Sequence, residues 1–211
     1  MTTESWRMRG LVLFDLDGVI LDSRANMEAA WSAVAAEFGI EIPFESYFAE
    51  IGRPFQDIMT RLGLADQGKR IEQVFRRASA RHLFDTPIFE GMETLLSNVA
   101  AYRIKLGIVT SKDFARTQLI LDRLPVEFSI VMTPNDRLRG KPAPDHLLQA
   151  MARCNTDPAA TIFIGDMDSD ADAARRARID YAHVLWGYGD PPPDCAFTAQ
   201  TPADLQHYLL G

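Results

Sequence analysis

The stretch that decides the fold is RGLVLFDLDGVILDS, Arg9 to Ser23. Its four apolar residues, Leu11 to Phe14, lead directly to Asp15, and a second carboxylate follows at Asp17 with Gly18 behind it. A short unbroken apolar run bounded by polar residues is typical of a strand buried in a parallel sheet. Two carboxylates this close repel each other, and a bound cation or a shared proton is the usual compensation. The stretch therefore predicts a buried strand that ends at a charged site.

Further apolar runs of strand length occur at 104–109, 128–132, 161–164 and 182–185. Helical patterns separate them, at 113–124, 143–154 and 169–178. Strands that alternate with helices of this length indicate βαβ units and a parallel sheet.

The region from 22 to 85 has a different pattern. It contains helical segments at 25–38, 55–62 and 69–84 and no convincing buried strand. We therefore predict an α/β fold, a doubly wound (Rossmann-like) parallel sheet with a small all-helical cap domain inserted after the first strand. The predicted core domain comprises residues 1–21 and 86–211, and the predicted cap domain comprises residues 22–85.

Composition narrows the class of function. The chain has 211 residues, 47% of them hydrophobic, and a net charge of −7, which argues against a nucleic-acid partner. No apolar run approaches the roughly 18 residues that a membrane span needs, and MTTESWRMRG lacks the apolar segment of a signal peptide. We expect a cytoplasmic monomer or homodimer without a membrane partner, in which Cys154 and Cys195 are reduced thiols.

Ligands of doubly wound sheets bind at the carboxyl ends of the strands. The residues that close the predicted strands are Asp15 with Asp17, then Thr110, then Asp166. The Thr110 hydroxyl and the N–H of Ser111 can donate to phosphate oxygens. Carboxylate oxygens suit a hard cation such as Mg²⁺, which binds through one or two carboxylates together with substrate phosphate.

Lys141 stands in the proline-flanked segment RGKPAPD, where it could neutralise both a nucleophile and a bound phosphate. Each candidate has a simpler interpretation when it is taken alone. Thr110 could cap a helix, Lys141 could lie on the surface, and the acids at 166–172 could begin a solvated helix. Only their joint occurrence favours a catalytic site.

Taken together, these motifs resemble the haloacid dehalogenase superfamily of aspartate-nucleophile hydrolases, in particular the phosphoglycolate-phosphatase-like branch with a helical cap. The motifs that carry the resemblance are Asp15-Leu16-Asp17-Gly18, Thr110, Lys141, and Gly165-Asp166 with Asp170. One residue departs from the pattern: Arg178 stands where the family often has glycine, near the end of the helix that follows Gly165-Asp166, so we expect a rearranged turn there.

The resemblance implies that Asp15 attacks phosphorus to form an aspartyl phosphate. It implies that Asp17 protonates the leaving oxygen and then deprotonates the attacking water. It places Mg²⁺ on Asp15, the backbone carbonyl of Asp17, and Asp166. The expected function is hydrolysis of a small phosphorylated metabolite, of the phosphoglycolate or sugar-phosphate type.

The remaining motif residues receive supporting roles from the same resemblance. Asp170 would orient Lys141 or a metal-bound water from outside the metal site. Thr110, Ser111 and Lys141 would bind the phosphate and neutralise the charge that develops on it.

Three other functions stay open at this point. A sugar phosphomutase shares the first motif, but its close examples carry a histidine where this chain has Met27. A phospho-accepting receiver domain uses similar residues but is shorter and lacks a helical insertion. A binding protein that has lost catalysis is the third, and the intact motifs argue against it.

Substrate choice should depend on the cap. Arg53 in EIGRPFQDIM could bind a carboxylate or a second phosphate, or it could be an ordinary surface arginine. Lys112, two residues after Thr110, could lean toward the phosphate, but we expect it to point into solvent, as we expect of Lys69 in the cap. Tyr188 is expected to close a loop and not to contact substrate.

Overall fold

The computed structural model describes residues 9–135 and 137–211. Its centre is a parallel sheet of six strands in the order β3-β2-β1-β4-β5-β6, so the predicted doubly wound α/β fold is confirmed. The strands are β1 (Leu11–Phe14), β2 (Lys105–Val109), β3 (Ile130–Met132), β4 (Thr161–Gly165), β5 (Asp180–Val184) and β6 (Phe197–Ala199).

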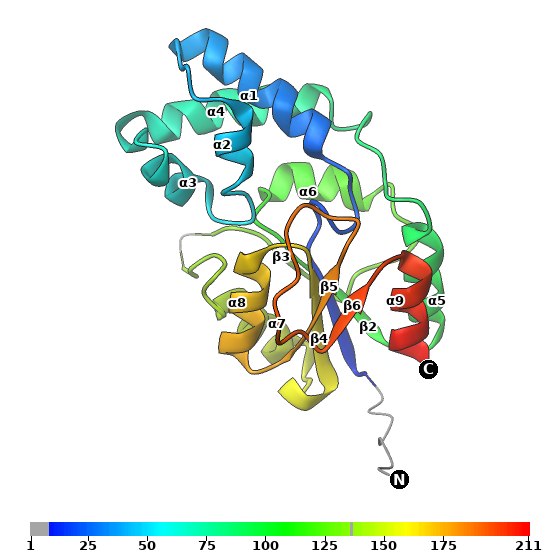
Figure 1. Cartoon of the computed structure of the whole chain (residues 1–211). Helices are drawn as coiled ribbons and strands as arrows, with labels where there is room; N and C mark the ends of the chain where they lie inside the picture. The colour runs from blue at the N-terminus through cyan, green and yellow to red at the C-terminus, as the bar shows by residue number, and fades with distance from the viewer. Residues whose placement is uncertain (1–8, 136) are drawn as a thin grey trace.

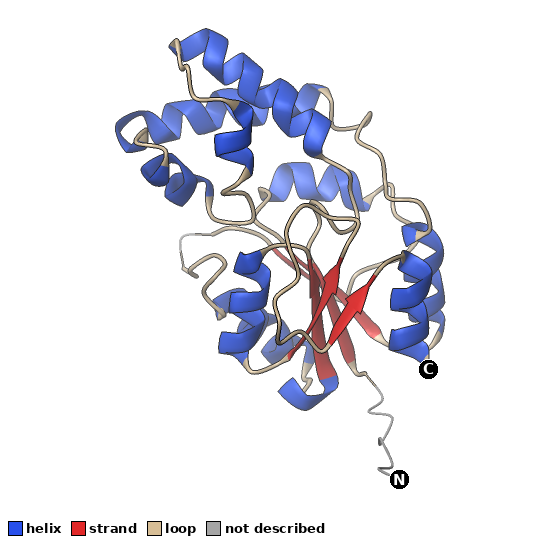
Figure 2. Cartoon of the chain, in the orientation of Figure 1, coloured by secondary structure: helices blue, strands red, loops and turns tan. Residues whose placement is uncertain are grey.

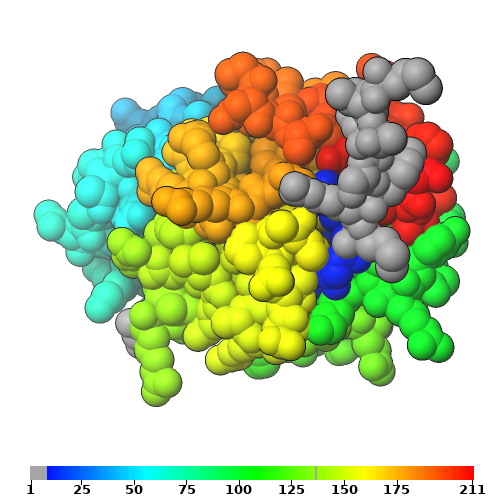
Figure 3. Space-filling model, turned by 90° about the horizontal axis from the view of Figure 1, so that it is seen from below, coloured from blue at the N-terminus to red at the C-terminus, as the bar shows by residue number. Residues whose placement is uncertain are grey.

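Strand β1 lies in the middle of this sheet. Leu11 pairs with Lys105 of β2 on one side and with Thr161 of β4 on the other. All four residues of β1 are fully buried, as the unbroken apolar run predicts. Seen from below, the start of β1 (blue) lies between the segments that lead into β2 (green) and β4 (yellow) (Figure 3).

Helices cover both faces of the sheet (Figures 1 and 2). Helices α5 (Met92–Ala101), α6 (Phe114–Leu121) and α9 (Pro202–Leu210) pack with Val12 and Phe14 on one face. Helices α7 (Asp145–Cys154) and α8 (Asp168–Ala177) pack with Leu11 and Leu13 on the other. Successive side chains of a strand point to opposite faces, so the run Leu11–Phe14 supplies both cores. Neither β6 nor α9 was expected from the sequence.

A block of helices follows β1 and lies above the carboxyl ends of the strands (Figure 1). Its elements are α1 (Arg24–Phe38), α2 (Phe44–Phe48), α3 (Phe55–Arg61), the short 3₁₀ turn η1 (Ala65–Gln67) and α4 (Gly68–Arg81). They bury an apolar core of their own, in which Trp31 stacks on Tyr47 with ring centroids 4.7 Å apart. This confirms the helical insertion after the first strand. We call this block the cap.

The chain enters and leaves the cap along one path. The N–H of Asp22 donates to the carbonyl of Pro87 at 3.0 Å, and the N–H of Phe89 donates to the carbonyl of Ile20 at 3.0 Å. The two crossings are therefore hydrogen-bonded to each other, and they join the cap to the sheet at one place.

The first turn of α1 is capped by a side chain that is distant in sequence. Ser23, at the N-cap position, makes no capping hydrogen bond with its own side chain. Instead the Tyr188 hydroxyl accepts from the N–H of Ser23 at 2.7 Å and from the N–H of Arg24 at 3.1 Å. It also donates to Asp22 Oδ1 at 3.0 Å, and its ring packs on Phe48 with centroids 4.9 Å apart. Tyr188 therefore closes a loop, as expected, and also fixes the start of the cap.

The expectation of a rearranged turn at Arg178 is wrong. Helix α8 ends in the ordinary left-handed cap, with Arg178 itself at φ 58° and ψ 42°. Its N–H donates back to the carbonyls of Ala174 and Arg175, as a C-cap does. Arginine therefore adopts the conformation that glycine adopts without cost, at about 1 kcal/mol of strain.

Across residues 9–135 and 137–211, the structure contains no helix with both the length and the apolar character of a membrane span.

Candidate active site

The carboxyl ends of the central strands bring three of the predicted residues together. The N–H of Asp15, directly after β1, donates to the carbonyl of Ile164 in β4 at 2.9 Å. The N–H of Thr110, directly after β2, donates to the carbonyl of Met132 in β3 at 3.1 Å. With Asp166 after β4, these side chains are almost completely buried. The sheet pairing therefore holds them at one place, as the sequence predicts.

Lys141 reaches this place from the loop before α7. Its Nζ lies 2.8 Å from Asp15 Oδ2 and 2.6 Å from Asp170 Oδ1, and the side chain is only 2% exposed. Burial alone would lower the pKa of Lys141, but the carboxylates of Asp15 and Asp170 more than offset this and hold it above its usual value. Lys141 is therefore a buried cation next to Asp15 and not a surface lysine.

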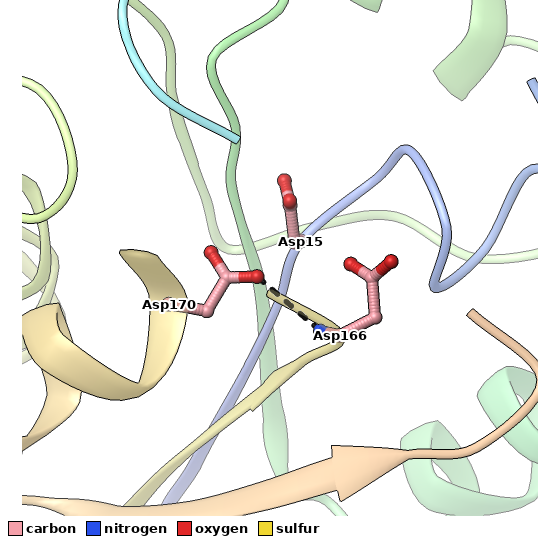
Figure 4. A group of neighbouring side chains, drawn as sticks. All are labelled: Asp15, Asp166 and Asp170. Carbon is pink, nitrogen blue, oxygen red and sulfur yellow. Dashed lines mark hydrogen bonds between the residues drawn. The ribbon is translucent and has the colours of Figure 1, made fainter. Parts of the chain in front are cut away.

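Asp15, Asp166 and Asp170 form a buried carboxylate cluster (Figure 4). One side-chain oxygen from each lies within 4.8 Å of the others. Burial, together with the carboxylates of Asp170 and Asp17, raises the pKa of Asp15 to about 7 despite Lys141. Burial, together with the carboxylates of Asp170 and Asp15, raises the pKa of Asp166 well above its usual value. The one ammonium of Lys141 does not balance this much negative charge.

Two carboxylate oxygens of the cluster without a hydrogen-bond partner in the described chain show whether a cation fits the site. Asp15 Oδ1 and Asp166 Oδ1 are buried and, among the described residues, have no hydrogen-bond partner. Unpartnered buried carboxylate oxygens are costly unless they meet a donor or a metal. An all-oxygen set of this kind suits a hard divalent cation. Asp15 and Asp166 therefore fit a metal site.

Asp170 is engaged differently within the cluster. Its Oδ1 pairs with Lys141, and its Oδ2 accepts from the N–H of Asp166 at 3.3 Å and of Met167 at 3.1 Å (Figure 4). Both oxygens therefore hold other parts of the site in position. This geometry agrees with an orienting role better than with direct metal binding.

Two glycines surround Asp166 closely. Gly18 follows the Asp17 turn at φ +80°, and a Cβ there would collide with the Asp166 carboxylate. A Cβ on Gly187 would also collide with Asp166. The N–H of Tyr188 donates to Asp166 Oδ2 at 2.9 Å. Glycine at these positions lets backbone approach the carboxylate, which is then fixed from one side.

Lys112 is not in solvent, so that expectation is wrong. Its side chain is 5% exposed, and its Nζ lies 3.0 Å from Asp17 Oδ1. Burial lowers the pKa of Lys112, and the Asp17 carboxylate partly offsets this. Lys112 lies next to Asp17 because β1 pairs with β2, which places the chain segments after Phe14 and Ile108 side by side.

A small cavity of about 70 Å³ lies between these residues and the cap. On the core side it is lined by Asp15, Asp17, Thr110, Ser111 and Lys112. The Ser111 hydroxyl donates to the carbonyl of Gly52 in the cap at 2.8 Å, so it also ties the cap to the core. The cavity therefore joins the predicted catalytic residues to the cap.

Arg53 lines this cavity, but its guanidinium is already paired with two carboxylates of the protein. Its Nη2 lies 2.9 Å from Asp168 Oδ2, and its Nε lies 3.3 Å from Glu50 Oε2. The structure therefore places Arg53 at the boundary of cap and core, between two carboxylates.

Arg116 and Ser79 also line the cavity and were missed by the sequence analysis. Arg116 donates from Nε to Asp113 Oδ2 at 2.5 Å and from Nη1 to the Ser79 hydroxyl of the cap at 2.7 Å. Asp113, three residues before Arg116 and at the N-cap position of the predicted helix after Thr110, is a local signal that could have indicated the contact between Asp113 and Arg116.

The sheet order, the helical insertion after β1 and the buried carboxylate cluster together define a haloacid dehalogenase-like hydrolase. Residues 12–184 match the family described as haloacid dehalogenase-like hydrolase, and the chain belongs to that family.

Known relatives fit this assignment. The chain is 29% identical over 204 residues to a phosphoglycolate phosphatase from Synechococcus elongatus, with 92% of this chain and 94% of the relative covered. It is 27% identical over 191 residues to an N-acetylmuramic acid 6-phosphate phosphatase from Pseudomonas putida, with 85% and 84% covered. The crystal structure of a hydrolase from Pseudomonas syringae is similar with a TM-score of 0.86 and 25% identity, over 95% of this chain and 98% of that one.

Proposed function

We propose that this haloacid dehalogenase-family phosphatase uses Mg²⁺ and an aspartyl-phosphate intermediate to hydrolyse a small phosphorylated metabolite of the phosphoglycolate or sugar-phosphate type. The observation that carries the proposal is the position of Asp15. It ends the central strand, faces a buried lysine at 2.8 Å, and shares a carboxylate cluster with Asp166.

Asp15 is the proposed nucleophile. A carboxylate oxygen attacks phosphorus, the bond from phosphorus to the ester oxygen breaks, and Asp17 gives its proton to that oxygen. In the second half, Asp17 takes a proton from water, which attacks the aspartyl phosphate. Inorganic phosphate leaves, and Asp15 returns as a carboxylate while Asp17 is again protonated.

The phosphate would be held from several sides. Thr110 and the N–H of Ser111 would donate to its oxygens, and the Lys141 ammonium would neutralise the charge that develops on them. Asp170, which pairs with Lys141 at 2.6 Å, would keep that ammonium in place.

The residues that would hold Mg²⁺ are Asp15, Asp166 and the backbone carbonyl of Asp17. The bound cation would supply positive charge to the phosphate oxygens and offset the repulsion among the carboxylates. The buried, unpartnered oxygens of Asp15 and Asp166 support this assignment.

Hydrolysis is preferred to transfer between two positions of a sugar. Met27, which stands where similar mutases carry histidine, lines the cavity, and its thioether cannot exchange a proton. Family membership and the helical insertion argue against a receiver domain. The relatives named above act on phosphoglycolate and on a sugar phosphate by their names, which is the range that we propose for this chain.

The test is phosphate release from a panel of phosphorylated acids and sugars, with Mg²⁺ and with EDTA. We expect metal-dependent release with one preferred class. The Asp15→Asn variant should lose more than a thousandfold in kcat while circular dichroism shows an intact fold. Metal-independent release, or an active Asp15→Asn variant, would refute the mechanism. Phosphate that moves between positions of a sugar, without release, would favour a mutase.

A further inference from the structure

Lys112 occupies the side of the cavity on which the leaving group would lie. Its ammonium is 3.0 Å from Asp17 Oδ1, and Asp17 is the residue proposed to protonate the leaving oxygen. A group attached to that oxygen, on the side away from phosphorus, would therefore come within reach of Lys112.

The ammonium has donors to spare. An ammonium carries three N–H donors. Within the described part of the chain, the only ionic partner of Lys112 Nζ is Asp17. The side chain is only 5% exposed and Lys112 lines the cavity, so water supplies little compensation. A second anion in the cavity would satisfy these donors.

The other cations at the cavity each contact two groups of the protein. The Arg53 guanidinium contacts Asp168 and Glu50, and the Arg116 guanidinium contacts Asp113 and Ser79. Among the described residues, Lys112 is thus the cavity cation whose charged group contacts only one partner, Asp17.

Much of the cap side of the cavity is apolar. Its apolar lining residues are Met27, Ile51, Phe55, Ile58 and Phe75, and they lie beside Tyr47, Arg53 and Ser79. Sugar hydroxyls that contact the apolar side chains lose water without gaining hydrogen-bond partners, which costs affinity.

We propose that Lys112 binds an anionic group one carbon away from the leaving oxygen, so that the substrate is the phosphate monoester of a small hydroxy acid and not a sugar phosphate. This inference rests on the proposed function and narrows its substrate class. A carboxylate placed there would receive charge-assisted hydrogen bonds from the ammonium.

The experiment compares phosphoglycolate with ethyl phosphate, which has a methyl group in place of the carboxylate. The variants are Lys112→Met and, as a control, Lys69→Met, an exposed cap lysine outside the cavity. The measured quantity is the ratio of kcat/KM for the two esters. We expect wild type to prefer phosphoglycolate, Lys112→Met to reduce that ratio about 10- to 100-fold, and Lys69→Met to preserve it.

A binding measurement keeps the inference separate from the proposed function. Calorimetry gives the affinity of phosphoglycolate and of ethyl phosphate for wild type, or for Asp15→Asn if turnover interferes, with and without Lys112→Met. Loss of affinity for phosphoglycolate alone supports the carboxylate site, even if no phosphate is released and the proposed function fails. If Lys112→Met does not fold, Lys112→Gln replaces it.

Other results would overturn the inference. An equal loss on both esters means that Lys112 serves Asp17 or the transferred phosphate and not a carboxylate. A wild-type enzyme that shows no preference for phosphoglycolate over ethyl phosphate, or that turns over hexose phosphates faster, refutes the proposed substrate class.

Discussion

Removal of the Tyr188 hydroxyl tests how the cap is attached to the core. That hydroxyl accepts from two N–H groups at the start of α1 and donates to Asp22 Oδ1. Ser23 provides no capping hydrogen bond from its own side chain, so the Tyr188→Phe variant leaves the first turn without its cap. The ring, its contact with Phe48 and the N–H that holds Asp166 remain in the variant.

The magnitude follows from the three hydrogen bonds. Each is worth about 1 kcal/mol net, and loss of an N-cap typically costs about 1 kcal/mol. The N–H of Arg24 is exposed and can rebind water, whereas the N–H of Ser23 is partly buried. We therefore expect the free energy of unfolding to fall by about 2 kcal/mol, or Tm to fall by about 4–8 °C.

The measurement is urea unfolding of wild type, Tyr188→Phe and a matched control, Tyr208→Phe. The Tyr208 hydroxyl accepts one hydrogen bond, from Arg9 at 3.1 Å, and lies in α9 away from the cap. Its loss should cost about 1 kcal/mol or less. If Tyr188→Phe costs no more than Tyr208→Phe, the hydroxyl does not cap α1 and the reasoning is refuted.

Three further predictions concern other parts of the chain. Asp170→Asn should lower kcat about 10- to 100-fold, because Lys141 loses the carboxylate that orients it; steady-state kinetics would contradict this with a loss below threefold. Arg178→Gly should raise the unfolding free energy by about 0.5 kcal/mol, because relief of left-handed strain exceeds the extra chain entropy of glycine; a lower urea midpoint would count against it. Burial lowers the pKa of His183 below its usual 6.5, so the unfolded chain binds the proton first, and stability that is complete above about pH 6.5 should be lost as pH falls below it. Urea midpoints at pH 7.5 and 5.5 should show less acid sensitivity in His183→Gln than in the exposed-site control His207→Gln, and equal sensitivity would refute the assignment.

The parts of the fold that could be predicted are those with a strong local pattern. The run from Leu11 to Phe14 is apolar at every position because β1 is buried on both faces, and it led to the correct sheet class. The positions of Asp15, Thr110 and Asp166 at one edge then follow from parallel pairing. Strand β6, by contrast, comprises only Phe197–Ala199, which is too short for periodicity to distinguish it from a loop.

The surroundings of the site were harder to predict, because they depend on contacts between distant segments. A lysine is rarely buried, so Lys112 was expected in solvent, and its contact with Asp17 arises only when β1 and β2 pair. The turn at Arg178 was predicted wrongly for a different reason. The packing of α8 against β5 already determines where α8 ends, and a strain of about 1 kcal/mol is too small to move that end.

The central position of β1 has a consequence for how the protein is made. β1 leaves the ribosome before the two strands that it pairs with, which begin only at Lys105 and Thr161. The cap helices contact one another over shorter sequence distances, so we expect them to form early. Leu11–Phe14 then remains unpaired until β2 and β4 have been synthesised. During that interval a fully apolar strand is exposed to pairing with other chains. Newly synthesised molecules should therefore depend on chaperones until β4 has been translated, and variants that slow folding should aggregate before they lose activity.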